Sequence, residues 1–169
     1  MVVLSNDNYH LSDEEYGKVL DNIVVACVDV AVIHGDNILL ERRVKEPAKN
    51  FLWIFGGRMK VGESFQQTAQ RGVARELGIN LAENRFHKLD TYSLVWPLRR
   101  ESPSQNGCHH VLVAHYVEID ESEKTVIDAT ITSSPNMQWF EVSEIESLDE
   151  TPELSAIVRD VKAKRSSSV

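Results

Sequence analysis

The sequence is poor in cysteine, in long apolar runs and in basic residues. Its two cysteines, Cys27 and Cys108, are too few for a disulfide framework. Both lie in strand-like apolar stretches, so we expect reduced thiols and a cytoplasmic location. The longest apolar run, 23–33, is interrupted by Asp29 and is too short to cross a bilayer. The first ten residues lack a basic segment followed by an apolar one, so we expect no secretion signal and no membrane partner.

The basic residues are outnumbered, because 18 Lys and Arg face 26 Asp and Glu and give a net charge of −8. This charge argues against a general nucleic-acid binder, and we expect no nucleic-acid partner. The charge is uneven, however, since residues 42–75 hold eight basic and two acidic side chains. A basic segment in an acidic chain suits a small anionic ligand such as a phosphorylated metabolite. A solvated basic face is the alternative of equal weight.

The length of 169 residues and the 42% hydrophobic content predict one globular domain. We divide the chain into an N-terminal segment with a short helix (1–22), a domain (23–165) and a flexible tail (166–169). Apolar runs and turn residues predict strands at 22–33, 37–43, 51–55, 86–96, 109–119 and 136–142. Capping residues and Pro152 predict helices at 12–20, at 64–77 and from 152 onwards. This order predicts an α/β sandwich with helices packed on a mixed sheet.

The stretch 56–79, GGRMKVGESFQQTAQRGVARELGI, joins a glycine turn to a helix. At about 100° per residue, an apolar stripe forms from Phe65, Ala69, Val73 and Leu77. Glu76 falls within the span of that stripe, whereas Arg71 and Arg75 lie on the far side. A carboxylate on the core side of a helix needs a partner. An arginine, backbone amides and a divalent metal ion are the alternatives, and the pattern leaves them open.

The spacing of this stretch resembles the Nudix box, G-x5-E-x7-R-E-U-x-E-E-x-G-U, in which U is bulky and apolar. The positions that fall in register are Gly57, Glu63, Arg71, Glu76, Gly78 and Ile79. The order of the surrounding elements also fits, so the resemblance implies a Nudix-type α/β/α sandwich with a mixed sheet over about residues 20–150. Two box glutamates are absent, because Gly72 and Arg75 stand in their places.

The same two losses occur in the GDP-mannose mannosyl hydrolases, a Nudix subfamily that the sequence also resembles in ERRVKEPAKNFLWIFGGR at 41–58. This resemblance implies that water attacks C1 of a nucleoside diphosphate sugar similar to GDP-mannose. Mg²⁺ and arginines then stabilise the departing nucleoside diphosphate. The resemblance implies that the Gly56 carbonyl and Glu76 hold the Mg²⁺, and that the protein is a homodimer. The implied substrate-binding residues are Asp29, Arg43, Arg58 and Arg71.

The histidine that serves this subfamily as general base has no counterpart at the matching positions, Ser133 and Ser134. A serine hydroxyl is unsuited to take a proton from water near neutrality. His110, on a predicted strand, is our candidate catalytic residue, and Asp128 is a carboxylate alternative. Two other functions stay open. One is a Nudix pyrophosphohydrolase that cleaves the P–O–P link, and the other is an inactive module that binds a nucleotide sugar.

The arginines of the resemblance also have structural alternatives. Arg43 is then a surface charge at the end of a hairpin, and Arg58 pairs with Asp29 inside the fold. Arg71 is then the partner of Glu63, and for Arg71 we favour this structural pair over contact with substrate.

Overall fold

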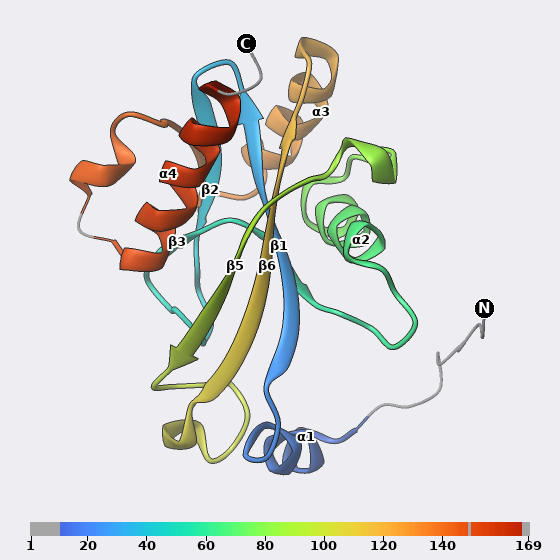
Figure 1. Cartoon of the computed structure of the whole chain (residues 1–169), viewed down its shortest axis with the longest axis vertical. Helices are drawn as coiled ribbons and strands as arrows, with labels where there is room; N and C mark the ends of the chain where they lie inside the picture. The colour runs from blue at the N-terminus through green and yellow to red at the C-terminus, as the bar shows by residue number, and fades with distance from the viewer. Residues whose placement is uncertain (1–10, 149, 167–169) are drawn as a thin grey trace.

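The computed structural model describes residues 11–148 and 150–166. Their strands form one mixed sheet, and helices pack around it (Figure 1). Its strands are β1 (Val25–His34), β2 (Asn37–Arg42), β3 (Leu52–Trp53), β4 (Phe55–Arg58), β5 (His87–Trp96), β6 (Cys108–Glu118) and β7 (Met137–Glu141). Its helices are α1 (Asp13–Leu20), α2 (Phe65–Leu77), α3 (Glu121–Thr132) and α4 (Pro152–Ser166). Short 3₁₀ turns lie at 83–85, 104–106 and 145–147.

The sheet has the order β3-β2-β1-β6-β5, with β4 paired to β1 and β7 paired to β2. Only the β1–β6 pair is parallel among the described strand pairs, and the others are antiparallel, so the predicted mixed sheet is confirmed. β1 lies at the centre and is buried on both faces, which explains its nearly continuous apolar sequence.

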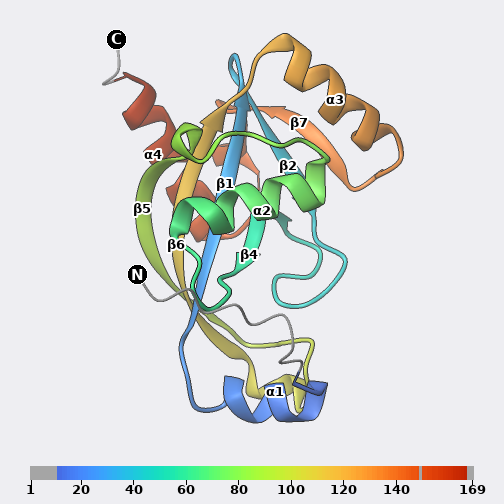
Figure 2. The same ribbon diagram turned by 90° about the vertical axis from the view of Figure 1, so that its right-hand side faces the viewer.

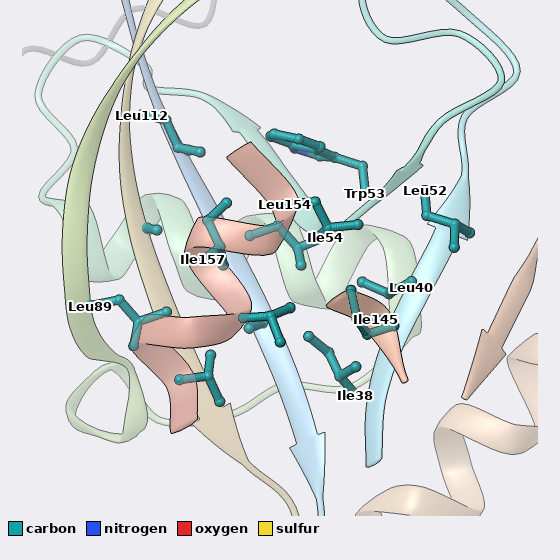
Figure 3. Close-up of a cluster of buried hydrophobic side chains, with 14 of the residues drawn as sticks. Ile38, Leu40, Leu52, Trp53, Ile54, Leu89, Leu112, Ile145, Leu154 and Ile157 are labelled. Carbon is teal, nitrogen blue, oxygen red and sulfur yellow. The ribbon is translucent and has the colours of Figure 1, made fainter. Parts of the chain in front are cut away.

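Helices cover both faces of the sheet, which gives the predicted α/β/α sandwich. Figures 1 and 2 show α2 and α3 on one side and α4 on the other. On the first side, even-numbered residues of β1 pack against α2, through Val28, Val30, Val32, Ala69, Val73 and Leu77. On the second side, odd-numbered residues of β1 and two residues of β2 pack under α4 (Figure 3), through Ala31, Ile33, Ile38, Leu40, Leu154 and Ile157.

The helix in the 56–79 stretch begins and ends where the sequence predicts. Ser64 is its N-cap and forms a capping box with Gln67, so two backbone N–H groups at the helix start are satisfied. Gly78 is its C-cap in the left-handed conformation, with φ of +70°, which a glycine adopts without strain. The predicted capping box of Ser12 and Glu15 likewise opens α1.

The expectation of one strand over 51–55 is wrong, because the chain breaks at Ile54 into β3 and β4. β2 pairs with only the last residues of β1, from Val32 to His34. The first half of β1 is therefore open to another partner, and β4 takes it, while β3 pairs with Glu41 and Arg42 on the edge of β2 opposite β7. The bend lets one segment pair with two strands in turn, and the bend positions the glycines of β4.

Two helices differ from the sequence-based expectation, namely α3 and the C-terminal end of α4. No element was predicted at 121–132, where α3 forms, because its β-branched residues weaken the helical pattern. The capping box of Asp120 and Glu123 was the available signal for that helix. Ser166 is the last residue of α4 and not part of a tail. Residues 1–10 of the predicted N-terminal segment and 167–169 of the predicted tail lie outside the described residues.

The two cysteines are free and buried, as predicted, and burial raises the pKa of the Cys27 thiol to about 12. In the part of the chain that the structure describes, no helix is long and apolar enough to span a membrane.

Helix α2 and strand β4 touch through glycines. A Cβ atom on Gly72 would lie 2.9 Å from the Cα atom of Gly56, which is closer than non-bonded carbon atoms pack. Gly56 itself has a φ of +153°, and a Cβ there would lie 2.1 Å from the carbonyl oxygen of Val28. Both positions therefore require glycine, and the contact fixes the height of α2 above the sheet.

We predict that Gly72→Ala destabilises the protein by about 1–3 kcal/mol, because the added methyl group pushes against backbone that cannot move aside. Elsewhere in a helix the same substitution stabilises, since alanine has less conformational freedom to lose. Urea unfolding followed by circular dichroism measures the change. Gln66→Ala on the same helix is the control and should change stability by less than about 0.5 kcal/mol. A more stable Gly72→Ala protein would show that the contact is not rigid.

Candidate active site

A cavity of about 430 Å³ opens on the face of the sheet that α4 also covers, but no described residue of α4 lines it. Its walls come from six strands, β1 to β6, from the end of α2 and from the loops after β2 and β5. The lining residues are Cys27, Asp29, Glu41, Arg43, Lys45, Glu46, Pro47, Ala48, Trp53, Ile54, Gly56, Gly57, Arg58, Arg75, Glu76, Leu94, Trp96, Arg100, Glu101, His110 and Leu112.

The cavity brings together six of the seven predicted site residues, namely Asp29, Arg43, Gly56, Arg58, Glu76 and His110. Strand register explains the convergence. Asp29 of β1 lies opposite Gly56 of β4, and the same half of β1 runs beside the start of β6, which carries His110. Arg43 follows β2 directly. Arg71 is the exception, because it does not line the cavity.

Arg71 is instead bound by Glu63, with Nε and Nη2 of the guanidinium 2.5 and 2.7 Å from the two carboxylate oxygens. Its Nη2 also donates to the carbonyl of Arg58 at 2.9 Å. Burial alone would raise the pKa of Glu63, but Arg71, the Lys60 amide and the Thr68 hydroxyl outweigh burial and lower this pKa to about 2. The pair ties the loop before α2 to the helix, as the favoured structural alternative expects.

Asp29 is a buried carboxyl group in the cavity wall. Its Oδ2 accepts a hydrogen bond of 2.8 Å from Nε1 of Trp53. The pKa of Asp29 is raised to about 6, because burial and the nearby carboxylate of Glu76 outweigh the opposing effects of Trp53 and Arg43. Asp29 is therefore ionised at neutral pH but close to taking a proton.

His110 is only 7% exposed, and its Nε2 atom has no hydrogen-bond partner among the described residues. Burial, together with the positive charges of Arg58 and Arg43, lowers the pKa of His110 to about 4. The imidazole is therefore neutral at pH 7, with one nitrogen able to accept a proton. An unpartnered buried nitrogen in a cavity wall is expected to meet a ligand or water there.

The other two predicted substrate-binding arginines, Arg43 and Arg58, are held in different ways. Nε of Arg43 donates to the carbonyl of Pro47 at 2.7 Å. Nη1 of Arg58 lies 3.2 Å from Oε1 of Glu101, and its guanidinium stacks 4.5 Å above the ring of Tyr16. Glu101, not Asp29, is thus the carboxylate partner of Arg58. Each contact uses a fraction of the five N–H donors of a guanidinium.

The predicted metal ligands are already bridged by an arginine. Oε2 of Glu76 accepts a hydrogen bond of 3.1 Å from the amide of Gly56. Nη2 of Arg75 lies 2.7 Å from the carbonyl oxygen of Gly56 and 2.5 Å from Oε1 of Glu76. The helical wheel predicted Arg75 on the far side, which is wrong because the long side chain reaches around the helix to the cavity.

The donor set does not fit a resident divalent ion. Within residues 11–148 and 150–166, no group of three or more His, Cys, Asp or Glu side chains could hold a metal. The two predicted ligands, Gly56 and Glu76, share one cation that already satisfies both. Mg²⁺ prefers six oxygen ligands in an octahedron, and a positive guanidinium on two of them opposes that arrangement.

The positions that match the missing histidine, Ser133 and Ser134, and the alternative base Asp128 lie away from the cavity. Ser133 and Ser134 sit at the end of α3, where the Ser133 hydroxyl donates to the carbonyl of Thr130. Oδ1 of Asp128 accepts a hydrogen bond from Nε1 of Trp139, and Oδ2 accepts one from Lys124. The side-chain hydrogen bond of Lys124 lowers the pKa of Asp128. None of these residues lines the cavity, so His110 is the predicted base that the fold places there.

Sequence reasoning missed several lining residues, chiefly Glu41, Trp53, Arg100 and Glu101. Glu41 had a signal, because it shares a strand face with Arg43. Arg100 and Glu101 had no such signal, since their position depends on the buried Arg99, which is distant in sequence from the box at 57–79. Arg99 donates to the carbonyls of Glu101 and Gly107 and to Asp21 beside α1, which fixes the 97–107 loop at the cavity.

A wider depression of about 1070 Å³ lies between α4 and the ends of β5, β6 and β7. Its arginines are committed to carboxylates of the fold. Arg165 pairs with Glu118 and Asp36, and Arg85 pairs with Glu123. It gathers none of the predicted site residues, so we place the functional site in the smaller cavity.

The chain belongs to the NUDIX domain family, because the family model matches residues 23–161. The Nudix resemblance is thereby confirmed, and membership supports a hydrolase, in a family whose enzymes generally use divalent metal ions. The match does not distinguish the GDP-mannose mannosyl hydrolases from other members.

Solved structures share the fold. A MutT NUDIX hydrolase from Burkholderia pseudomallei has a TM-score of 0.63 and 19% identity, covering 83% of this chain and 99% of the other. A NUDIX hydrolase from Nitrosomonas europaea has a TM-score of 0.60 and 19% identity, covering 84% and 90%. NrtR from Shewanella oneidensis, solved with a 27mer DNA, has a TM-score of 0.60 and 14% identity, covering 83% of this chain.

The NrtR match corrects one expectation. This chain spans only 61% of the NrtR chain, and that protein was solved in complex with DNA. A protein of this fold therefore does take a nucleic-acid partner, and the expectation of no such partner, drawn from a net charge of −8, is contradicted. Net charge describes the whole surface and says little about one face of it. The homodimer stays a prediction.

We predict that Asp29→Asn alters the pH dependence of stability. The native pKa of about 6 exceeds the ordinary 3.8, so the native state binds more protons between these values, and wild-type stability falls as pH rises from about 4 to about 6. The variant lacks this loss and should be more stable than wild type above pH 6, by on the order of 2 kcal/mol.

Urea unfolding of both proteins at a series of pH values gives the difference. His110 titrates with the opposite sign, since its lowered pKa makes stability fall as pH drops below about 6.5, but this effect is present in both proteins and cancels. Parallel stability curves for wild type and variant would show that the Asp29 pKa is not raised.

Proposed function

We propose that the protein hydrolyses a nucleoside diphosphate sugar similar to GDP-mannose at the sugar C1, releasing a nucleoside diphosphate and a free sugar. The observation that carries the proposal is the convergence of Asp29, Arg43, Arg58 and His110 on one cavity. Asp29, Arg43 and Arg58 are substrate-binding residues that the resemblance implies, and His110 is the candidate base.

The arginines suit the leaving group. When the bond between C1 and the β-phosphate oxygen breaks, negative charge grows on the diphosphate, and fixed cations beside it lower the barrier. Arg43 and Arg58 line the cavity and are held by Pro47 and Glu101, so little reorganisation is needed as the charge develops. Arginine also binds phosphate oxygens in pairs, which orients the leaving group.

His110 supplies the base. Its neutral imidazole has an unpartnered Nε2 in the cavity wall, and this nitrogen accepts the proton of the attacking water. The water oxygen bonds to C1, and the electron pair of the broken C–O bond leaves on the diphosphate. Binding of the diphosphate neutralises the arginines whose charges lower the pKa of His110, so the base becomes stronger when substrate is present.

Cleavage of the P–O–P link is the competing reaction for a member of this family. Pyrophosphohydrolases of this type need box carboxylates that hold metal ions, and Gly72 and Arg75 stand in those places. The Mg²⁺ expected at Gly56 and Glu76 conflicts with Arg75, so no step of the proposed reaction passes through a metal.

We predict that incubation with GDP-mannose yields GDP and mannose, resolved by phosphorus NMR and by sugar analysis. A panel of other nucleotide sugars, each with and without Mg²⁺, tests the base and the sugar. Nucleoside monophosphate and sugar phosphate as products would overturn cleavage at C1. Binding without any product would support the inactive module.

We predict that His110→Gln lowers kcat by at least about 10²-fold with little change in KM, since general base catalysis contributes about this much. His109→Gln is the matched control, because His109 is the adjacent residue, bonds to Ser93 and does not line the cavity. Equal activity of both variants would remove His110 from the reaction.

We also predict that GDP raises the pKa of His110 above about 4, because the bound diphosphate offsets Arg43 and Arg58. Proton NMR titration of the imidazole C–H signals, assigned with the His110→Gln variant, measures the shift. A pKa that is unchanged or lower in the presence of saturating GDP would mean that the diphosphate lies away from these arginines.

A further inference from the structure

Arg75 does more than replace a glutamate of the box, because it contacts both predicted metal ligands. Its Nη2 atom touches both the Gly56 carbonyl oxygen and the Glu76 carboxylate, at 2.7 and 2.5 Å. These are the two oxygens that the family resemblance assigns to a metal ion. The positive guanidinium of Arg75, a side chain of α2, therefore occupies the position in the cavity wall that the resemblance gives to a metal ion.

The Arg75 side chain lies against the glycine strand, in ordinary van der Waals range of Gly57. Gly57 carries no Cβ, and one built there would lie 3.5 Å from Nη2 of Arg75. Glu76 is oriented from its other side by the amide of Gly56, so its second oxygen faces Arg75. The side chain of Arg75 is 52% exposed, and it lines the cavity. It can therefore meet a ligand while it holds both oxygens.

The charges of the cavity wall agree with this role. Five basic and five acidic side chains line the cavity, namely Arg43, Lys45, Arg58, Arg75, Arg100, Asp29, Glu41, Glu46, Glu76 and Glu101. With the box glutamate at position 75, four basic residues would face six acidic ones. That excess of two negative charges is what one divalent cation cancels, and the exchange of glutamate for arginine cancels it equally.

We propose that Arg75 takes the place of the divalent metal, so that this site binds the diphosphate of its ligand without a metal ion. The proposal rests on the proposed function for the identity of the ligand, but the absence of metal binding is independent of it. Arginine suits the task because it binds phosphate oxygens in pairs and stays charged at every accessible pH.

The test uses Mn²⁺ alone and GDP alone as probes of the full chain. Electron paramagnetic resonance measures Mn²⁺ binding without ligand, and calorimetry measures GDP binding in EDTA and in Mg²⁺. We expect wild type to bind Mn²⁺ at least tenfold more weakly than Arg75→Glu does. We expect the GDP affinity of wild type to change less than twofold between EDTA and Mg²⁺. In Arg75→Glu, GDP affinity in EDTA should fall at least tenfold and recover with Mg²⁺.

The control is Arg100→Glu, which makes the same charge change at a similarly exposed arginine of the same cavity. Arg100 contacts Asp13 and Glu101 and neither predicted metal ligand, so this variant should gain no Mn²⁺ binding. Arg75→Gln, followed with a thermal melt, replaces Arg75→Glu if the latter does not fold. It should weaken GDP binding in EDTA at least fivefold.

Equal Mn²⁺ affinity in wild type and Arg75→Glu would overturn the proposal. So would a wild-type protein that needs Mg²⁺ to bind GDP. If no variant binds GDP under any condition, the proposed function fails, while the Mn²⁺ measurement still decides the role of Arg75.

Discussion

The contact between α2 and β4 is the constraint on which the site depends. Gly72 and Gly56 meet backbone to backbone, because neither position has room for a side chain. This close approach brings the last turn of α2 to the glycine strand. Glu76 can then accept from the Gly56 amide, and Arg75 can reach the Gly56 carbonyl. A helix held further from the sheet would lose both contacts.

Burial in the cavity shifts the pKa values of Asp29 and His110 in opposite directions. Burial raises the pKa of Asp29 and lowers that of His110, and so favours the neutral form of both. The positive charge of Arg43 lowers both pKa values, which keeps Asp29 ionised near neutrality and His110 unprotonated. An anion that neutralises the arginines therefore changes the protonation of both groups together, which couples ligand binding to the acid–base state of the site.

The sequence was sufficient for the fold class, for α2 with both of its ends, and for six of the residues that line the cavity. Local signals such as capping residues and strand alternation predict the fold class and α2, whereas the family resemblance implies five of the cavity residues, and His110 is the candidate base. The break of 51–55 into two strands was not predictable, because it depends on where β2 stops pairing with β1. Glu101 was missed since its position depends on Arg99, α1 and a loop distant in sequence. Arg75 was misplaced because a helical wheel describes Cβ directions, whereas a long side chain can reach around the helix.

The two departures from the box have different physical origins, and they should not be counted as one loss. At position 72 the reason is steric, since any side chain would meet the backbone of Gly56. A carboxylate cannot be restored there without moving the helix. At position 75 the reason is electrostatic, because the half-exposed side chain leaves room for either charge and only the sign has changed. The first departure sets how closely the helix lies against the strand, and the second decides which cation faces the cavity. With both glutamates absent, Arg75 supplies the positive charge that a metal ion would otherwise bring to this site.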